Sequence, residues 1–177
     1  MPRLFTGIEI PACAAAYLAA ARGGIYGARW IDPKDYHLTL RFVGDVDTRM
    51  ANEIGGALWD VRRPKVSIQF DGLHWFGGDK PRAIVAKVKS SPELMDLQVE
   101  HERRLRHLGL APETRKYIPH VTLARLRSPS THAVAEYLGT RGALDAPGFE
   151  ALQFVVYSAR DAVGGGPYIV EAAYPLL

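Results

Sequence analysis

The sequence has 177 residues, of which 47% are hydrophobic and 23% charged, a balance typical of globular proteins. No apolar run approaches the roughly 18 residues of a membrane span. The single cysteine, Cys13, excludes an internal disulfide and a cysteine-based zinc site. The net charge of +3 suits a polyanionic partner without identifying one.

The chain length and the N-terminal residues indicate how many globular units to expect and whether a secretory signal is present. At this size we expect one globular unit over residues 1–177. The N-terminal apolar tract is interrupted by Glu9 and Pro11, so it lacks the continuous apolar core of a secretory signal. We therefore expect a cytoplasmic chain.

Hydrophobic periodicity predicts strands and helices in the first third of the chain. Alternation predicts a strand over 3–10, and an alanine-rich stretch predicts a helix over 12–22. A longer strand should end at Gly44, and a helix should begin at Asp47 or Thr48.

The remaining segments continue this alternation. The further predicted elements are paired strands 65–76 and 81–90, a helix over 92–110, a strand over 117–126, a helix over 128–138, and strands 148–159 and 167–176. Helices are few and strands are often adjacent. This order favours an α+β fold with antiparallel pairing over a doubly wound parallel sheet.

One pattern, histidine–apolar–threonine–leucine, occurs twice. The first copy lies in "YHLTLRFVG" (36–44) and the second in "PHVTLARL" (119–126), nearly half a chain later. This spacing predicts two related lobes that face one another. Residues two apart on a strand share a face, so each histidine should lie beside its threonine.

The neighbouring side chains follow the same alternation. It predicts Arg41 on the histidine face of the first strand, with Leu40 and Phe42 in the core. Arg125 would lie on the opposite face from the second histidine. It can serve the same site only if the strand ends or bulges near Ala124.

Two imidazoles that approach a phosphodiester from opposite sides can catalyse an in-line displacement without a metal ion. One accepts a proton from the attacking oxygen while the other protonates the leaving oxygen. Histidine suits both roles, because its neutral and its protonated forms are both accessible near neutral pH. Threonine hydroxyls can bind the non-bridging oxygens, and a guanidinium can bind the remaining charge. The structural alternative is a pair of histidines bonded to threonines inside a core.

These motifs resemble those of the 2H phosphoesterase superfamily, and within it the RNA 2′,3′-cyclic phosphodiesterases, also called 2′-5′ RNA ligases. The resemblance runs from "RLFTGIEIP" through "ARWIDPKDYHLTLRFVGDV", "PRAIVAKV" and "YIPHVTLARL" to "VVYSARDAVGGGPYIVEAAYPL". It implies a single bilobal α+β domain over 1–177. Each of its two pseudo-symmetric lobes would hold an antiparallel sheet, helices and one motif, with a central groove between them.

The resemblance also implies an activity and its residues. The protein would hydrolyse RNA or nucleotide 2′,3′-cyclic phosphates to 2′-phosphomonoesters, with no metal and no other cofactor. His37 matches the histidine that protonates the leaving 3′ oxygen, and His120 matches the one that activates water. Thr39 and Thr122 match the phosphate-binding threonines, and Arg125 matches the arginine after the second motif.

Three further residues are candidate substrate contacts. Arg41 could bind the phosphate, and Tyr117, in "TRKYIP" just before the second motif, could contact a nucleic-acid chain. His74, in "DGLHWFGG", could stack on a base at the groove edge, although packing at a strand end explains it as well.

Other functions remain open at this point. They are a non-catalytic nucleotide- or RNA-binding module that uses the same groove, a 2H enzyme acting on another cyclic phosphate, and a 2′-5′ RNA ligase. A binding module would not need both histidines. We expect a monomer whose partners are RNA ends or nucleotides with a 2′,3′-cyclic phosphate, and no membrane partner.

Overall fold

The computed structural model describes residues 3–159 and 166–177. The elements, in chain order, are β1 (Arg3–Glu9), α1 (Ala12–Ala19), β2 (Arg29–Trp30), a 3₁₀ turn (Pro33–Asp35), β3 (His37–Asp45), α2 (Thr48–Trp59), β4 (Val66–Ile68), β5 (Phe70–Phe76), β6 (Ala83–Val88), α3 (Pro92–His107), β7 (His120–Arg125), α4 (Thr131–Arg141), β8 (Phe149–Ala151), β9 (Gln153–Ala159) and β10 (Tyr168–Pro175). Within these described ranges no helix is long and apolar enough to cross a membrane.

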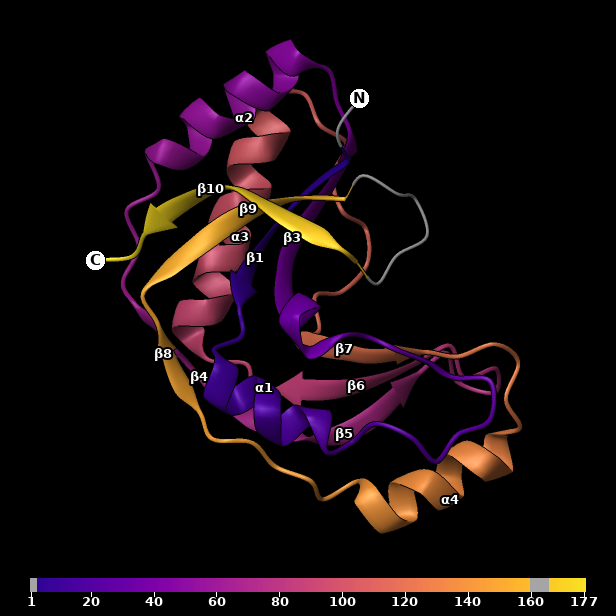
Figure 1. Cartoon of the computed structure of the whole chain (residues 1–177). Coiled ribbons are helices and arrows are strands. Elements are labelled where there is room, and N and C mark those ends of the chain that lie inside the picture. The colour runs from indigo at the N-terminus through magenta and orange to yellow at the C-terminus, as the bar shows by residue number, and fades with distance from the viewer. Residues whose placement is uncertain (1–2, 160–165) are drawn as a thin grey trace.

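The architecture is α+β, as predicted, with antiparallel pairing throughout (Figure 1). The main sheet has the order β10-β9-β1-β3-β7-β6-β5, and β2 pairs with the far end of β7. The central strands β3 and β7 pair at one position, Leu38 opposite Val121. These are the residues between the histidine and the threonine of each motif.

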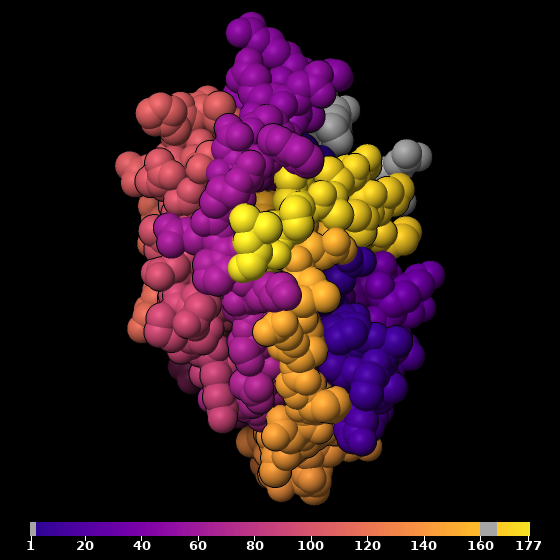
Figure 2. Space-filling model, turned by 90° about the vertical axis from the view of Figure 1, so that its left-hand side faces the viewer, coloured from indigo at the N-terminus to yellow at the C-terminus, as the bar shows by residue number. Residues whose placement is uncertain are grey.

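Apart from the edge strand β10, the order of the main path is symmetric about that central pair. Apart from the short β2, two repeats of the order β-α-β-α-β-β run from β1 to β5 and from β6 to β9. The last strand of each repeat crosses into the other half of the sheet, because β5 pairs with β6 and β9 pairs with β1. Each lobe is therefore built from both repeats. Figure 2 shows two segments far apart in the sequence side by side, with β10 (yellow) against α2 (purple).

Two predicted strands are each divided in the structure, and this is a correction. The segments 65–76 and 148–159 break at Gln69 and Leu152. The part of each segment that precedes the break lies outside the main sheet. These two parts are β4 and β8, which pair with each other in a small separate sheet. The sequence pattern is continuous through both breaks. The breaks arise from the pairing of β4 with β8, which joins one strand from each repeat.

The helices pack on one face of the main sheet. Their buried residues form a single hydrophobic cluster that includes Leu38 and Val121. Side chains alternate along a strand, so the motif histidines and threonines lie on the opposite face. A smaller cluster there contains Phe5, Val155 and Tyr157.

Local signals in the sequence set the helix ends. The Asp47 carboxylate accepts a 2.7 Å hydrogen bond from the Met50 backbone and caps α2, as predicted. The Ser91 hydroxyl oxygen caps α3 in the same way, just before Pro92. Gly109 follows α3 with a positive φ of 94°, a conformation that favours glycine.

Candidate active site

A cavity of about 820 Å³ lies over the junction of β3 and β7. Its lining includes both histidines and both threonines of the motifs, together with the arginine that follows the second one. The structure therefore brings together the five residues predicted to act in catalysis and phosphate binding, namely His37, Thr39, His120, Thr122 and Arg125.

The antiparallel pairing arranges the four motif side chains as a square. Since β3 and β7 pair at the middle residue of each motif, His37 lies across from Thr122, and Thr39 lies across from His120. The histidines occupy one diagonal, and diagonal neighbours in such a pair are roughly 7–8 Å apart. One phosphate group fits between two imidazoles at that separation.

Each motif strand contains a β-bulge immediately after its threonine. The pairing of β1 with β3 skips Leu40, and the pairing of β6 with β7 skips Leu123. Beyond a bulge the alternation of faces is reversed. The fifth residue after each histidine therefore returns to the cavity face, and it is Arg125 in β7 and Phe42 in β3. The bulge that Arg125 requires to reach the cavity is therefore present, at Leu123, next to the predicted position near Ala124.

The bulge in β3 also overturns two predictions. Phe42 is 51% exposed rather than part of the core. Arg41 is turned away from the histidine face. It touches the cavity wall, but its buried guanidinium donates hydrogen bonds to the Glu102 carboxylate and to the carbonyl oxygens of Phe42 and Ala111. Arg41 therefore joins β3 to the segment before β7.

Both imidazoles are oriented by the same kind of backbone contact. The Nδ1 atom of His37 lies 2.9 Å from the Asp35 carbonyl oxygen, and Nδ1 of His120 lies 2.7 Å from the Ile118 carbonyl oxygen. A carbonyl oxygen only accepts, so each Nδ1 carries the hydrogen and donates. Nε2 is then the nitrogen that can exchange a proton with a substrate.

Aromatic rings surround His37. The rings of Phe5, Tyr157 and Tyr168 lie 4.9, 5.4 and 4.9 Å from the imidazole, measured between centroids. The pKa of His37 is lowered to about 4, chiefly by burial and also by the positive charge of the second imidazole and of Arg125, whereas the hydrogen bond to the Asp35 carbonyl raises it. The free protein therefore holds His37 unprotonated at neutral pH.

The second histidine is less enclosed. The His120 ring packs edge-on against Phe76, with 4.6 Å between centroids. Burial lowers the pKa of His120, and the charge of Arg125 acts in the same direction, whereas the hydrogen bond to the Ile118 carbonyl raises it. The two imidazoles therefore differ in their packing more than in their hydrogen bonds.

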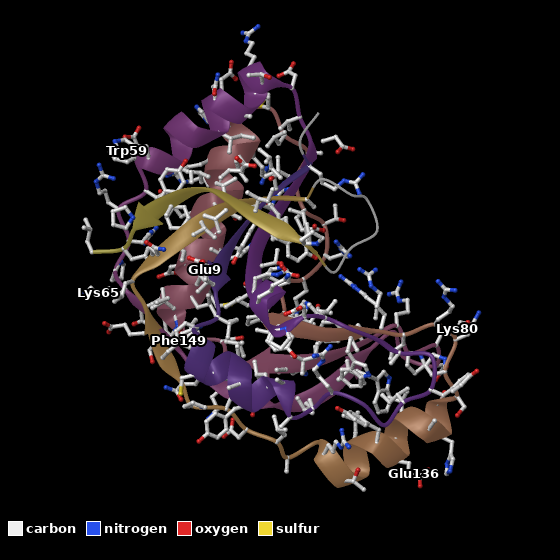
Figure 3. All side chains as sticks on the ribbon, viewed as in Figure 1. Glu9, Trp59, Lys65, Lys80, Glu136 and Phe149 are labelled. Atoms are coloured by element: carbon white, nitrogen blue, oxygen red, sulfur yellow. The ribbon has the colours of Figure 1, made fainter. Side chains whose placement is uncertain are left out.

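The cavity wall is strongly positive. Beyond the motif residues and Arg41, the cations on it are Arg3, Arg82, Arg115 and Lys116. Glu113 is the one carboxylate among the described lining residues, and it pairs with Arg115. Figure 3 shows nitrogen-tipped side chains gathered in the space above β6 and β7. Sequence reasoning missed Arg3 and Arg82 as site residues, because only the pairing of β1 and β6 with the motif strands brings them there.

The two remaining candidates have different positions. Tyr117 lines the cavity, and its hydroxyl donates a 2.7 Å hydrogen bond to the Thr39 carbonyl oxygen. Burial raises the pKa of Tyr117, so its phenol stays protonated. His74 is not brought into the cavity. It lies on β5, two strands from β7, with Nε2 3.0 Å from the Asp71 carbonyl oxygen.

The arrangement offers acid–base chemistry at a bound phosphate. Two fixed imidazoles present Nε2, two hydroxyls flank them, and a guanidinium lies at one end. Within residues 3–159 and 166–177, no three histidine, cysteine, aspartate or glutamate side chains are grouped so that they could hold a metal ion.

Comparison with solved structures supports the fold. The chain is similar to TT0787 of Thermus thermophilus, with a TM-score of 0.83 and 20% identity over 98% of this chain and 97% of that one. It is also similar to LigT of E. coli in complex with 3′-AMP, with a TM-score of 0.80 and 21% identity over 99% and 98% of the two chains. At these identities the likeness concerns the fold alone.

Comparison of sequences identifies the family. The chain is 37% identical over 99 residues to an RNA 2′,3′-cyclic phosphodiesterase of Aeropyrum pernix, covering 55% of this chain and 56% of that protein. It is 33% identical over 130 residues to the protein of that name in Bacillus subtilis, covering 70% and 71%. The chain thus spans little more than half of the first relative. The family model LigT like Phosphoesterase matches residues 8–85 and 87–168, and each segment carries one histidine–threonine motif. The chain therefore belongs to the LigT-like phosphoesterase family.

Proposed function

We propose that this protein hydrolyses the 2′,3′-cyclic phosphate of RNA ends or nucleotides to a 2′-phosphomonoester, without a metal ion. One observation carries the proposal. The two motifs meet antiparallel at a single backbone pair, which sets two imidazoles diagonally across one positively charged cavity. The names of the relatives support the same reaction.

His120 acts as the general base. Its Nδ1 hydrogen is committed to the Ile118 carbonyl, so the neutral ring presents a lone pair on Nε2. The lowered pKa keeps this ring neutral at pH 7. Nε2 takes a proton from water as the water oxygen attacks phosphorus. Arg125 and the hydroxyls of Thr39 and Thr122 stabilise the charge on the non-bridging oxygens.

His37 acts as the general acid. As the bond between phosphorus and the 3′ oxygen breaks, protonated Nε2 gives its proton to that oxygen, and the phosphate remains on the 2′ oxygen. The aromatic enclosure that lowers the pKa of His37 also makes its protonated form a strong acid. Binding of an anionic substrate beside the ring favours that protonated form.

The experiment is an assay of 2′,3′-cyclic AMP and of a short RNA ending in a cyclic phosphate, with EDTA present and with 2′- and 3′-phosphate products resolved. Wild type, His37→Ala and His120→Ala are compared. His132→Ala is the matched control, because its side chain is 90% exposed on α4. We expect EDTA-resistant formation of the 2′-phosphate, a loss of about 10² to 10⁴ in rate for either motif variant, and no loss for the control.

Three other outcomes would contradict the proposal. Retained nucleotide binding with no turnover by the wild type would identify a binding module. Turnover of another cyclic phosphate, or joining of RNA ends, in place of this hydrolysis would assign a different reaction to the same histidines. Unfolding of His120→Ala would indicate that this ring has a structural role.

A further inference from the structure

The two motif histidines have the same backbone anchor but different surroundings. In each motif the Nδ1 atom bonds the carbonyl oxygen of the residue two positions earlier, which is Asp35 in the first motif and Ile118 in the second. The side chain of Ile118 is apolar and 42% exposed. The anchor therefore does not require a carboxylate, and the side chain of Asp35 is available for a second contact.

This second contact joins Asp35 to the start of β10. The backbone nitrogen of Tyr168 donates a 3.2 Å hydrogen bond to one carboxylate oxygen of Asp35. The chain is also close at Gly166, where an added Cβ atom would lie 2.5 Å from the other carboxylate oxygen. The segment that enters β10 therefore passes directly against this carboxylate.

The Tyr168 side chain packs over the first motif histidine. Its ring meets the His37 imidazole edge-on, with 4.9 Å between centroids, and it meets the Phe5 ring in the same way at 5.1 Å. In the main sheet β10 is an edge strand whose neighbour is β9. An edge strand is bonded to the sheet along one side, so the bond from Asp35 adds a direct connection between the first residue of β10 and the turn that precedes His37.

Charged and titratable groups face His37 from several elements. They are Asp35 in the 3₁₀ turn, Glu9 opposite His37 on β1, His120 and Arg125 on β7, Tyr157 on β9 and Tyr168 on β10. Burial is nevertheless the largest cause of the lowered pKa of His37. The Tyr168 ring supplies part of that burial, so its displacement would admit water and raise the pKa towards the ordinary value of histidine.

We propose that Asp35 is a positioning residue of the site. Its carbonyl oxygen orients the His37 imidazole, and its carboxylate holds Tyr168 over the same ring, so one residue controls both the direction and the enclosure of this histidine. The inference rests on the proposed function for the role of His37 as the general acid. At the equivalent position of the second motif, Ile118 has no carboxylate, and His120 is less enclosed.

The test is titration of the histidine rings by NMR, with the His37 signal assigned from its loss in His37→Ala. We expect the wild-type ring to remain neutral down to about pH 5, as its pKa of about 4 requires. In Asp35→Ala and in Tyr168→Ala the midpoint should rise by about one pH unit or more, with a smaller change at His120. Asp35→Asn should stay near the wild type, because its amide oxygen still accepts the bond from the Tyr168 backbone.

Three further variants isolate the contact. Gly166→Ala places a methyl group against the same carboxylate without altering Asp35, so it should act like Asp35→Ala. The double variant Asp35→Ala with Tyr168→Ala should match Tyr168→Ala alone, since both changes act on one ring. Asp32→Asn is the matched control, because Asp32 carries an exposed carboxylate in the same turn whose hydrogen bond goes to the Lys34 backbone. It should leave the midpoint unchanged.

The outcomes separate this inference from the proposed function. An unchanged midpoint in Asp35→Ala and Gly166→Ala, an equal rise in Asp35→Asn, or additive rises in the double variant would overturn the positioning role. Cyclic phosphodiesterase activity is measured separately with EDTA present, and kcat should fall about tenfold in Asp35→Ala and be retained in Asp35→Asn. If the wild type lacks that activity but the His37 midpoint still depends on Asp35 and Tyr168, the proposed reaction fails and the positioning role stands.

Discussion

The hydroxyl of Tyr117 donates a 2.7 Å hydrogen bond to the backbone carbonyl of Thr39, and this bond joins the segment before one motif strand to the centre of the other. The bond therefore links the two halves of the main sheet at their junction, where the backbones of β3 and β7 pair at only one position. Tyr117, a candidate substrate contact in the sequence, therefore also fixes the position of the first motif.

Tyr117→Phe should lower both stability and activity. The variant leaves the carbonyl of Thr39 without this donor, which costs about 1–3 kcal/mol when the group is buried. A displaced Thr39 should also reduce kcat/KM for the cyclic phosphate. Urea denaturation and steady-state kinetics measure the two effects, with Tyr26→Phe as the exposed control. An unchanged unfolding free energy would contradict the bracing role.

Substitution of Arg41 should lower mainly the stability of the protein, and substitution of Arg125 should lower mainly its activity. Arg41→Met removes the partner of a largely buried Glu102 carboxylate, so we expect a loss of about 3 kcal/mol in unfolding free energy, with activity retained below the unfolding transition. Arg125→Ala changes an exposed residue at the site, so it should lower kcat/KM and leave stability nearly unchanged. A rise in KM for Arg41→Met without destabilisation would instead make Arg41 a substrate contact.

The pH dependence of kcat/KM should reflect both histidines of the free protein. Their pKa values are lowered below 6.5 by burial, to about 4 for His37. In the proposed mechanism the reactive form carries one proton on the pair, and that proton is lost as the pH rises above both values. We expect kcat/KM to fall about tenfold per pH unit above pH 7. A plateau between pH 7 and 9 would be incompatible with this assignment.

A buried histidine outside the site should control acid stability. His101 is fully buried on α3, and its Nδ1 lies 2.9 Å from the Thr6 hydroxyl oxygen. Its Nε2 has no hydrogen-bond partner among residues 3–159 and 166–177. Burial lowers the pKa of His101 to about 3. Below pH 6.5 the unfolded chain binds a proton that the folded chain does not, so stability falls from about pH 6.5 towards pH 3.

The matching experiment replaces both members of that pair. Thr6→Val with His101→Leu removes two polar groups together, which should be close to neutral at pH 7.5 and should reduce the loss of stability between pH 7.5 and 4.5. Urea midpoints at both pH values provide the measurement, and His132→Gln, on the exposed face of α4, is the control. An identical loss in the double variant would exclude His101 as a cause.

The sequence was sufficient for the α+β class and for grouping the two histidines and threonines, because strand alternation and the repeated motif are local signals. It also showed that Arg125 needs a bulge. The same argument failed for Arg41 and Phe42, since nothing in "LTLRFVG" distinguishes a regular strand from a bulged one. The contribution of Arg3 and Arg82 depends on which strands pair, and that is a long-range property.

The exchange of β5 and β9 between the two halves of the sheet has a consequence for how the protein forms. Each half of the main sheet includes a strand from the other repeat, and the groove lies where the two motif strands meet, so it cannot be assembled from either half of the chain alone. Most tertiary contacts of the protein join residues distant in sequence, a property that slows folding. A chain cut between β5 and β6 should yield two fragments that stay unstructured apart and recover the groove only when mixed.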